Sequence, residues 1–159
     1  MNAFARGASC YARDARLQQA VAWRLARHCR DLPLPEGPVV DLGAGSGNLS
    51  QALTAQRPEL DPLLVDNCPE LLAEAAAPAG RCRPWDLNAG LPPEARAAAL
   101  LLSSFALHWL KAPEQQLRHW CEQLRPRGWL ALAVPLQGSF ASWHLAAERA
   151  GVACSALPL

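Results

Sequence analysis

The feature that most constrains this chain is a glycine turn inside the stretch VVDLGAGSGNLS, residues 39–50. An apolar run ends in Asp41, and Gly43, Gly45 and Gly47 then alternate with small residues. Glycine reaches positive φ without strain and has no Cβ, so a ligand can approach a backbone of this kind closely. A glycine-rich turn without a ligand is the alternative. The strand-like run before the turn and the acids downstream favour a binding loop.

Strand-like and helix-like segments alternate along the chain. We expect strands over 39–42, 62–66, 81–87 and 128–136. The segment 97–110 begins as a fourth strand, although its length leaves a helix open. Helices are expected over about 11–30, 46–56, 69–77, 112–125 and 142–151. This order implies βαβ units, and therefore an α/β protein with a mostly parallel sheet and right-handed crossovers.

The composition is that of a compact domain. The chain has 159 residues, of which 51% are apolar and 18% charged, enough to bury a core. A formal net charge of +1 gives no reason to expect nucleic acid, and no run reaches the roughly 18 apolar residues of a membrane span. The six cysteines are scattered, without zinc spacing. They predict free thiols in a reducing cytoplasm and no metal site.

The first 30 residues are strongly basic, with six arginines against Asp14 alone. An arginine-rich start is typical of a transit peptide. A helix is the alternative, and we favour it because a mostly apolar stripe recurs at helical spacing. The stripe consists of Leu17, Ala20, Val21, Arg24, Leu25 and His28. No apolar segment with a small-residue cleavage site is present, so we expect a cytoplasmic rather than a secreted protein.

Two ligand classes compete for the glycine turn. Dinucleotide folds use GxGxxG, but here the third glycine comes one residue early, at Gly47, with Asn48 in the place of the expected glycine. A P-loop is excluded because no GK[ST] follows. In the remaining pattern, acid-x-Gly-x-Gly-x-Gly, the chain resembles the class I S-adenosylmethionine-dependent methyltransferases, since DLGAGSG matches their first motif throughout. The resemblance implies a Rossmann-like, three-layer α-β-α fold and S-adenosyl-L-methionine as the cofactor.

The later strand ends supply the other expected cofactor residues. Asp66 ends the second strand, where a carboxylate can accept hydrogen bonds from both ribose hydroxyls; NAD enzymes place an acid similarly, so the glycine spacing discriminates. The resemblance puts Asp86 and the backbone of Leu87 beside the adenine amino group, with a helix N-cap as the alternative for Asp86. Residues 103–104 match the segment that lines the methionine end. The full expected set is Asp41, Gly43, Gly45, Gly47, Asp66, Asn67, Asp86, Leu87, Ser103 and Ser104.

The second half resembles one group in particular, the malonyl-acyl-carrier-protein O-methyltransferases of biotin synthesis. Members carry an ALxW stretch, an RPxG turn and a QGS segment, which here are residues 106–109, 125–128 and 137–139. The start of the chain is also similar to theirs, which caps the cofactor pocket. The matching residues are Phe4, Ala8, Tyr11, Ala15, Leu17 and Gln18. Methyltransferases of small carboxylic acids, the trans-aconitate type, share the ALxW feature.

This resemblance implies O-methylation of the free carboxylate of malonyl-acyl carrier protein or malonyl-CoA. A carboxylate is already ionised at neutral pH, so the in-line displacement needs orientation rather than a base or metal. The family places a tyrosine by the reaction centre, which makes Tyr11 the first catalytic candidate, and His108 the second. A packing or capping role is the alternative for His108.

The tryptophans are expected to serve packing. Trp109 would lie in the core or the pocket wall. Trp23, Trp120, Trp129 and Trp143 recur at helical or strand spacing, as core aromatics usually do.

A carrier-protein partner would be acidic and would be received by a basic patch. Arg118, Arg125 and Arg127 lie close in sequence and could contribute to such a patch. Helix-end arginines that complement the helix dipole are the alternative.

The chain also departs from the class I pattern, whose sheet has seven strands. No sixth or seventh strand is predicted here, since only VACSALPL follows Gly151. We therefore expect one C-terminally short methyltransferase domain over 1–159, with a cap helix in 1–32 and the cofactor-binding core in 37–159. Its fifth strand would be an exposed apolar edge, which predicts self-association through that edge. The alternative to an enzyme is a methyltransferase-like module that binds the cofactor without turnover.

Overall fold

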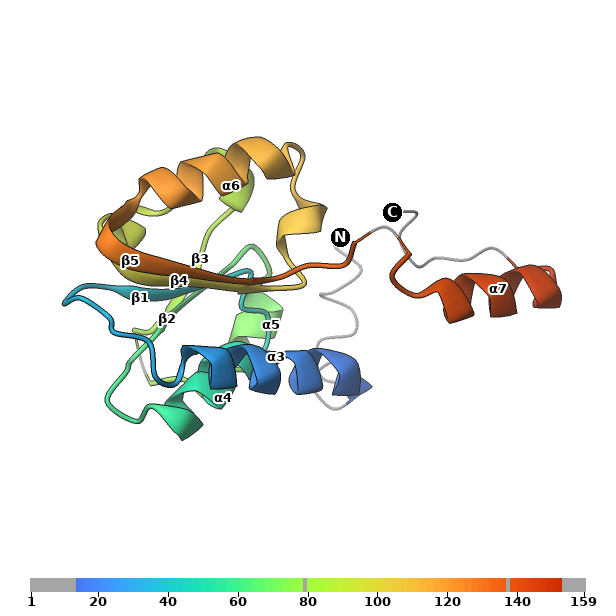
Figure 1. Ribbon diagram of the computed structural model, residues 1–159, viewed down its shortest axis with the longest axis horizontal. Coiled ribbons are helices and arrows are strands. Elements are labelled where there is room, and N and C mark those ends of the chain that lie inside the picture. The colour runs from blue at the N-terminus through green and yellow to red at the C-terminus, as the bar shows by residue number, and fades with distance from the viewer. Residues whose placement is uncertain (1–13, 79, 137, 153–159) are drawn as a thin grey trace.

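The computed structural model describes residues 14–78, 80–136 and 138–152, and its parallel sheet confirms the predicted α/β fold (Figure 1). The strands are β1 (Val39–Leu42), β2 (Leu63–Asp66), β3 (Cys82–Pro84), β4 (Ala98–Ser104) and β5 (Leu124–Ala133). They lie in the order β3-β2-β1-β4-β5, and all neighbours are parallel. The strand order reverses between β1 and β4, which is where such sheets bind ligands.

Helices cover both faces of the sheet, as the three-layer prediction requires. The α-helices are α3 (Arg16–Cys29), α4 (Asn48–Gln56), α5 (Pro69–Ala73), α6 (Pro113–Glu122) and α7 (Ala141–Ala150). Three short 3₁₀ turns are η1 (Leu87–Ala89), η2 (Pro93–Ala95) and η3 (Leu107–Trp109). Figure 1 shows α3, α4 and α5 on one face and α6 on the other. The segment 97–110 is thus strand β4 followed by η3.

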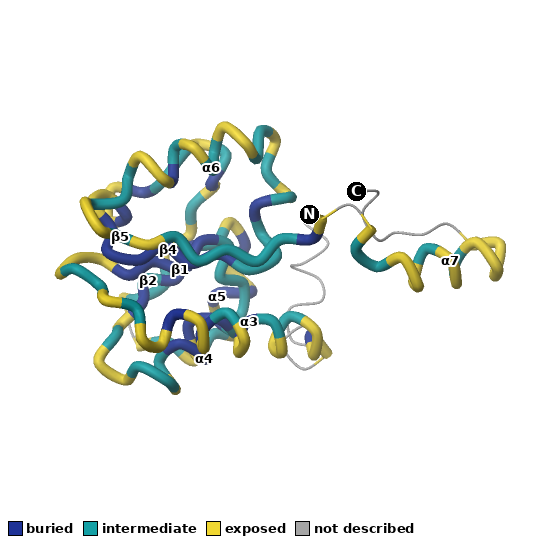
Figure 2. The backbone as a smooth tube through the Cα atoms, in the orientation of Figure 1, coloured by how far each residue is buried: buried dark blue, intermediate teal, exposed yellow. Residues whose placement is uncertain are grey.

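The core has two parts, one on each face of the central strands. Side chains alternate across a strand, and β4 accordingly sends Leu100 and Leu102 toward α3 and α4, and Leu101 toward Trp120 of α6. All residues of β1 and nearly all of β4 are buried (Figure 2). The continuous apolar runs that predicted these strands therefore reflect burial on both faces.

The basic N-terminal segment is helical from Arg16 to Cys29, as predicted for that part of it. The buried face, however, is not the predicted stripe. Ala22, Ala26 and Cys29 are buried, whereas Leu17 is 49% exposed. Small side chains let a helix approach its neighbours closely, and this packing outweighs the larger apolar residues of the predicted stripe.

Strand β5 begins earlier than predicted because it contains a bulge, and it ends at Ala133 rather than at residue 136. Ala98 pairs with Leu124, but two residues further along β4 the partner is already Trp129, so the RPRG stretch between them bulges out. A Cβ on Gly128 would lie 2.7 Å from the carbonyl oxygen of Ala98, which explains the glycine there. Among the described strands, β5 forms one edge of the sheet.

The packing prediction holds for Trp120 but is wrong for three other tryptophans. Trp120 is fully buried, whereas Trp23, Trp129 and Trp143 are 52%, 40% and 65% exposed. Trp143 belongs to α7, which projects from the sheet and buries no residue (Figure 1). Aromatic spacing alone did not distinguish a core position from an exposed face.

The described cysteines, Cys29, Cys68, Cys82 and Cys121, are free thiols. In the described ranges, no group of three or more histidine, cysteine or acidic side chains is placed to hold a metal ion. None of the helices found in those ranges has the length and apolar character to cross a bilayer.

Replacing Trp120 tests the packing of α6. Trp120→Ala should lower the free energy of unfolding by about 3–5 kcal/mol, because it leaves a large cavity between α6 and the sheet. Trp120→Phe should lower it less, since the ring contacts remain and the indole N–H, which has no described hydrogen-bond partner, is removed. Urea denaturation measures both. Trp143→Ala is the matched control, expected within about 0.5 kcal/mol of wild type; equal losses for the two alanine variants would contradict this packing.

Candidate functional site

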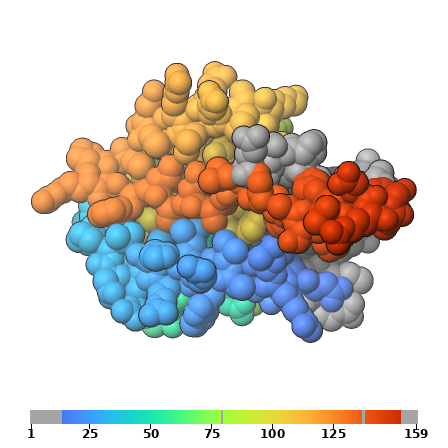
Figure 3. All heavy atoms as spheres, turned by 45° about the vertical axis from the view of Figure 1, so that its right-hand side comes forward, coloured from blue at the N-terminus to red at the C-terminus, as the bar shows by residue number. Residues whose placement is uncertain are grey.

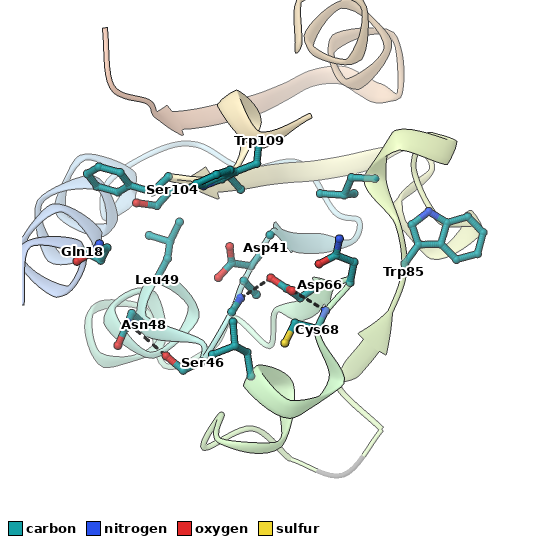
Figure 4. Close-up of a pocket in the computed structure, with 18 of the residues that line it drawn as sticks. Gln18, Asp41, Ser46, Asn48, Leu49, Asp66, Cys68, Trp85, Ser104 and Trp109 are labelled. Carbon is teal, nitrogen blue, oxygen red and sulfur yellow. Dashed lines mark hydrogen bonds between the residues drawn. The ribbon is translucent and has the colours of Figure 1, made fainter. Parts of the chain in front are cut away.

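A pocket of about 440 Å³ lies at the carboxyl ends of the first four strands, at the point where the strand order reverses. The loops that follow these strands form its wall, and α3 adds one side (Figure 4). Eight of the ten expected cofactor residues line it: Asp41, Gly43, Gly45, Asp66, Asn67, Asp86, Leu87 and Ser104.

The three glycines of the turn all have left-handed backbones, with φ of +72°, +54° and +79° for Gly43, Gly45 and Gly47. At two of these positions the packing of the protein itself requires glycine. A Cβ on Gly43 would collide with the Cβ of Ala106, and one on Gly47 would lie 3.0 Å from a methyl group of Leu64. A Cβ on Gly45 would meet no described atom closer than 3.9 Å. Gly45 lines the pocket, and the space beside its Cα is open to a ligand.

Asp66 joins the glycine turn to the end of β2. Its Oδ2 accepts the N–H of Gly45 at 2.8 Å, and its Oδ1 accepts the N–H of Cys68 at 2.8 Å. Burial raises the pKa of Asp66, and these backbone hydrogen bonds partly offset that effect. A carboxylate has about four lone-pair sites, so Asp66 keeps acceptor capacity beyond its backbone hydrogen bonds. The fixed carboxylate can therefore accept a hydroxyl of a ribose.

Asp41 lies beneath the turn and is buried, with 1% of its surface exposed. Its Oδ2 accepts two hydrogen bonds from Ser50 of α4, from the backbone N–H at 3.1 Å and from the hydroxyl at 2.8 Å. Burial, with a smaller contribution from the charge of Asp66, raises the pKa of Asp41 to about 7. Asp41 thus connects β1 to α4 and titrates near neutral pH.

Asp86 has the alternative role predicted for it, as a helix N-cap, and it also lies in the pocket lining. It is the N-cap of η1, where its Oδ1 accepts the backbone N–H of Asn88 at 2.9 Å and the Asn88 amide at 2.8 Å. These hydrogen bonds lower the pKa of Asp86. Asp86 also lines the pocket, and its Oδ2 makes no hydrogen bond with a described residue. One oxygen is therefore held while the other is available to a ligand.

The structure separates the two adjacent serines, Ser103 and Ser104. Ser103 is fully buried, and its hydroxyl donates to the carbonyl oxygen of Leu42 at 2.8 Å, so it links β4 to β1 and does not line the pocket. Ser104 lines the pocket, and its buried Oγ has no described partner. The alternation of side chains along β4 produces this difference.

Of the two catalytic candidates, only His108 belongs to the described residues. Tyr11 is outside the described residues, as are Phe4 and Ala8 of the matching chain start. His108 does not line the pocket; burial lowers its pKa, and its Nδ1 has no described partner. The His108 ring packs beside Trp109, with 5.3 Å between the centroids. Trp109 does line the pocket, as one of its two expected locations required.

Several lining residues were not among the ten expected cofactor residues. Gln18 and Ala22 of α3 form one side of the pocket, and Trp85, which precedes Asp86 in the chain, also lines it. Figure 4 labels Gln18 and Trp85. The Trp85 indole N–H donates to the carbonyl oxygen of Gly90 at 2.9 Å, which fixes the ring. Gln18 was part of the chain start that resembles a pocket cap, so a signal existed for it. For Trp85, adjacency to Asp86 was the available signal.

Filling the space beside Gly45 should remove cofactor binding. Gly45→Val places two methyl groups in the open space next to Asp66, so calorimetric titration with S-adenosylhomocysteine should show no saturable binding. The left-handed backbone also makes the variant less stable, by about 1–3 kcal/mol. Gly80→Val is the matched control, because Gly80 has φ of +82° and no described atom near an added Cβ. Equal affinity in both variants would remove this assignment of the turn.

The raised pKa of Asp41 predicts a pH-dependent stability of the free protein. Between about pH 5 and 7, Asp41 is protonated in the folded state and ionised in the unfolded state, so its contribution to stability falls as pH rises. The expected slope is about 1.4 kcal/mol per pH unit. Asp41→Asn stays neutral and should lack this component when urea unfolding is followed across that range. Parallel pH profiles for the two proteins would show that Asp41 is ionised throughout.

Comparison with known proteins identifies the family. A family profile described as a methyltransferase domain matches residues 11–156. The chain is 34% identical to the malonyl-[acyl-carrier protein] O-methyltransferase of Alcanivorax borkumensis, over 98% of this chain and 54% of that protein. It is 33% identical to the trans-aconitate 2-methyltransferase of Mycobacterium tuberculosis, over 70% of this chain and 41% of that protein. The chain thus spans about half the length of these curated relatives.

A solved structure shares the fold. The plantazolicin methyltransferase BpumL in complex with SAH superposes with a TM-score of 0.66, covering 86% of this chain and 55% of that one at 14% identity. The residues of the pocket fit S-adenosyl-L-methionine, the cofactor of the family, because an open glycine backbone lies beside a carboxylate that can accept a ribose. The glycine motif, the sheet order and the family match agree: the chain belongs to the class I S-adenosylmethionine-dependent methyltransferases.

Proposed function

We propose that this chain forms the cofactor-binding part of a cytoplasmic O-methyltransferase that methylates the free carboxylate of a malonyl thioester, carried by acyl carrier protein or coenzyme A, in biotin synthesis. The observation that carries the proposal is the similarity to a malonyl-[acyl-carrier protein] O-methyltransferase over 98% of the chain, joined to the open glycine turn beside Asp66. Reduced cysteines suit that compartment.

The chemistry asks little of the protein beyond orientation. When bound, S-adenosyl-L-methionine supplies an electrophilic methyl group. The turn at Gly45 and the carboxylates of Asp66 and Asp86 would hold the nucleoside, and α3 would limit the access of water from one side. The accepting carboxylate is ionised at neutral pH, so no base is needed to activate it. Holding the two reactants in line then provides most of the rate.

The acceptor would be held at the end of the pocket near η3. Ser104 offers a buried hydroxyl without a described partner, which can donate to a carboxylate. Trp109 and Phe105 provide an apolar wall beside it. Tyr11 remains our candidate for the second donor to the acceptor. We give His108 a supporting role at most, because it lies behind Trp109 and not in the pocket lining.

Two other functions have support. Similarity to a trans-aconitate 2-methyltransferase favours a free small carboxylic acid as the acceptor. Coverage of about half of the relatives' length favours a cofactor-binding module whose turnover depends on further chain. Both alternatives keep the same cofactor pocket, so the acceptor and the turnover have to be tested separately from binding.

The test is methyl transfer from radiolabelled S-adenosyl-L-methionine to a panel of acceptors, after binding of S-adenosylhomocysteine has been established. Malonyl-acyl carrier protein and malonyl-CoA should be methylated, while acetyl-CoA, which lacks the free carboxylate, should not. Methylation of trans-aconitate alone would identify the small-acid alternative. Binding without transfer to any acceptor would identify the module.

A further inference from the structure

The outer face of α3 is an exposed basic surface that the methyl-transfer chemistry does not use. Arg16, Arg24 and Arg27 are exposed along this helix, and no acidic residue occurs within it. Trp23, 52% exposed, and Leu17, 49% exposed, lie among them. We call these five residues the α3 face.

The charge of this face is not neutralised within the described part of the chain. Arg30, just after the helix, pairs with Asp31 at 3.0 Å, but Arg16, Arg24 and Arg27 make no ion pair with a described residue. The helix dipole accounts for Arg27, which stands in the last turn. It does not account for Arg16, because a positive charge in the first turn is unfavourable there. The positive charge of Arg16, Arg24 and Arg27 is therefore open to an external anion.

The α3 face adjoins the wall of the pocket at its amino end. Gln18 and Ala22, on the inner side of the same helix, line the pocket, and α3 lies on the molecular surface (Figure 3). Arg24 and Arg27 are about 9–14 Å further along the helix from Gln18, at 1.5 Å per residue. Arg16 and Leu17 lie next to the pocket-lining Gln18, and a macromolecule bound to the whole face would reach from this pocket wall along the helix to Arg27.

We propose that the α3 face docks an acidic acyl carrier protein, with Trp23 and Leu17 as apolar anchors flanked by the arginines. The proposal rests on the proposed function, in which a carrier delivers the malonyl group on a flexible arm. Complementary charge would steer and orient the encounter, and exposed tryptophan beside arginine is typical of interface hot spots. A free coenzyme A thioester has no protein surface to dock and would not need the anchors.

The arginines that the sequence suggested for this role are badly placed. Arg125 and Arg127 belong to the bulge at the amino end of β5, whereas the pocket opens at the carboxyl ends of the strands. The length of β4 separates them, about 23 Å for seven residues. Arg118 lies on α6, on the opposite face of the sheet from α3 (Figure 1). These residues instead provide a control with the same change of charge.

The test compares Arg24→Glu/Arg27→Glu with Arg118→Glu/Arg127→Glu. Affinity for fluorescently labelled malonyl-acyl carrier protein is measured by anisotropy in the presence of S-adenosylhomocysteine, so that the readout does not require turnover. The α3 variant should bind the carrier at least roughly tenfold more weakly, and the control variant within about twofold of wild type. Arg24→Gln/Arg27→Gln should fall between wild type and the charge reversal. For wild type, added salt should weaken binding.

The other outcomes separate the two proposals. Unchanged carrier affinity in the α3 variant, or equal losses in both variants, would overturn the docking surface. If the variants in that case still methylate malonyl-CoA at the wild-type rate, the docking surface is rejected and the proposed function is retained. Loss of S-adenosylhomocysteine binding in Arg24→Glu/Arg27→Glu would indicate a folding defect. The carrier affinity of Arg24→Gln/Arg27→Gln would then test the docking surface in its place. Selective loss of binding to phosphatidylglycerol vesicles, with carrier binding intact, would assign the face to a membrane and overturn the proposal.

Discussion

The site depends on one hydrogen bond, from the N–H of Gly45 to the carboxylate of Asp66 at 2.8 Å. It joins the turn after β1 to the end of β2, so that the exposed backbone and the acid lie next to each other before any ligand arrives. The neighbouring N–H groups of Gly43 and Ala44 donate to the carbonyl oxygen of Val65 at 2.8 and 3.0 Å and support the same junction. Without these contacts the turn after β1 would not be held in one position at the base of the pocket.

The parts of the fold that were predictable from sequence are those in which local pattern and tertiary environment agree. Apolar runs gave the central strands because β1 and β4 are buried on both faces. The glycine spacing indicated the ligand class because each glycine has a positive φ that other residues rarely adopt. The same reasoning identified Asp66 and Asp86, which end or follow neighbouring strands of a parallel sheet and so meet at one edge.

The parts that sequence could not give depend on the direction of a side chain or on packing at a distance. Ser103 and Ser104 are alike in sequence, and the phase of β4 alone sends one hydroxyl to Leu42 and the other to the pocket. The bulge before Trp129 shifts the start of β5 and could be recognised only from its pairing with β4. Trp23, Trp129 and Trp143 are partly exposed because of how their helix or strand faces solvent, which spacing does not encode.

The hydrogen bonds within the glycine turn also affect the entropy change when a nucleoside binds. Because its N–H groups already have partners within the protein, the turn has little freedom left to lose when a nucleoside is bound. A preorganised floor of this kind loses little affinity to ordering.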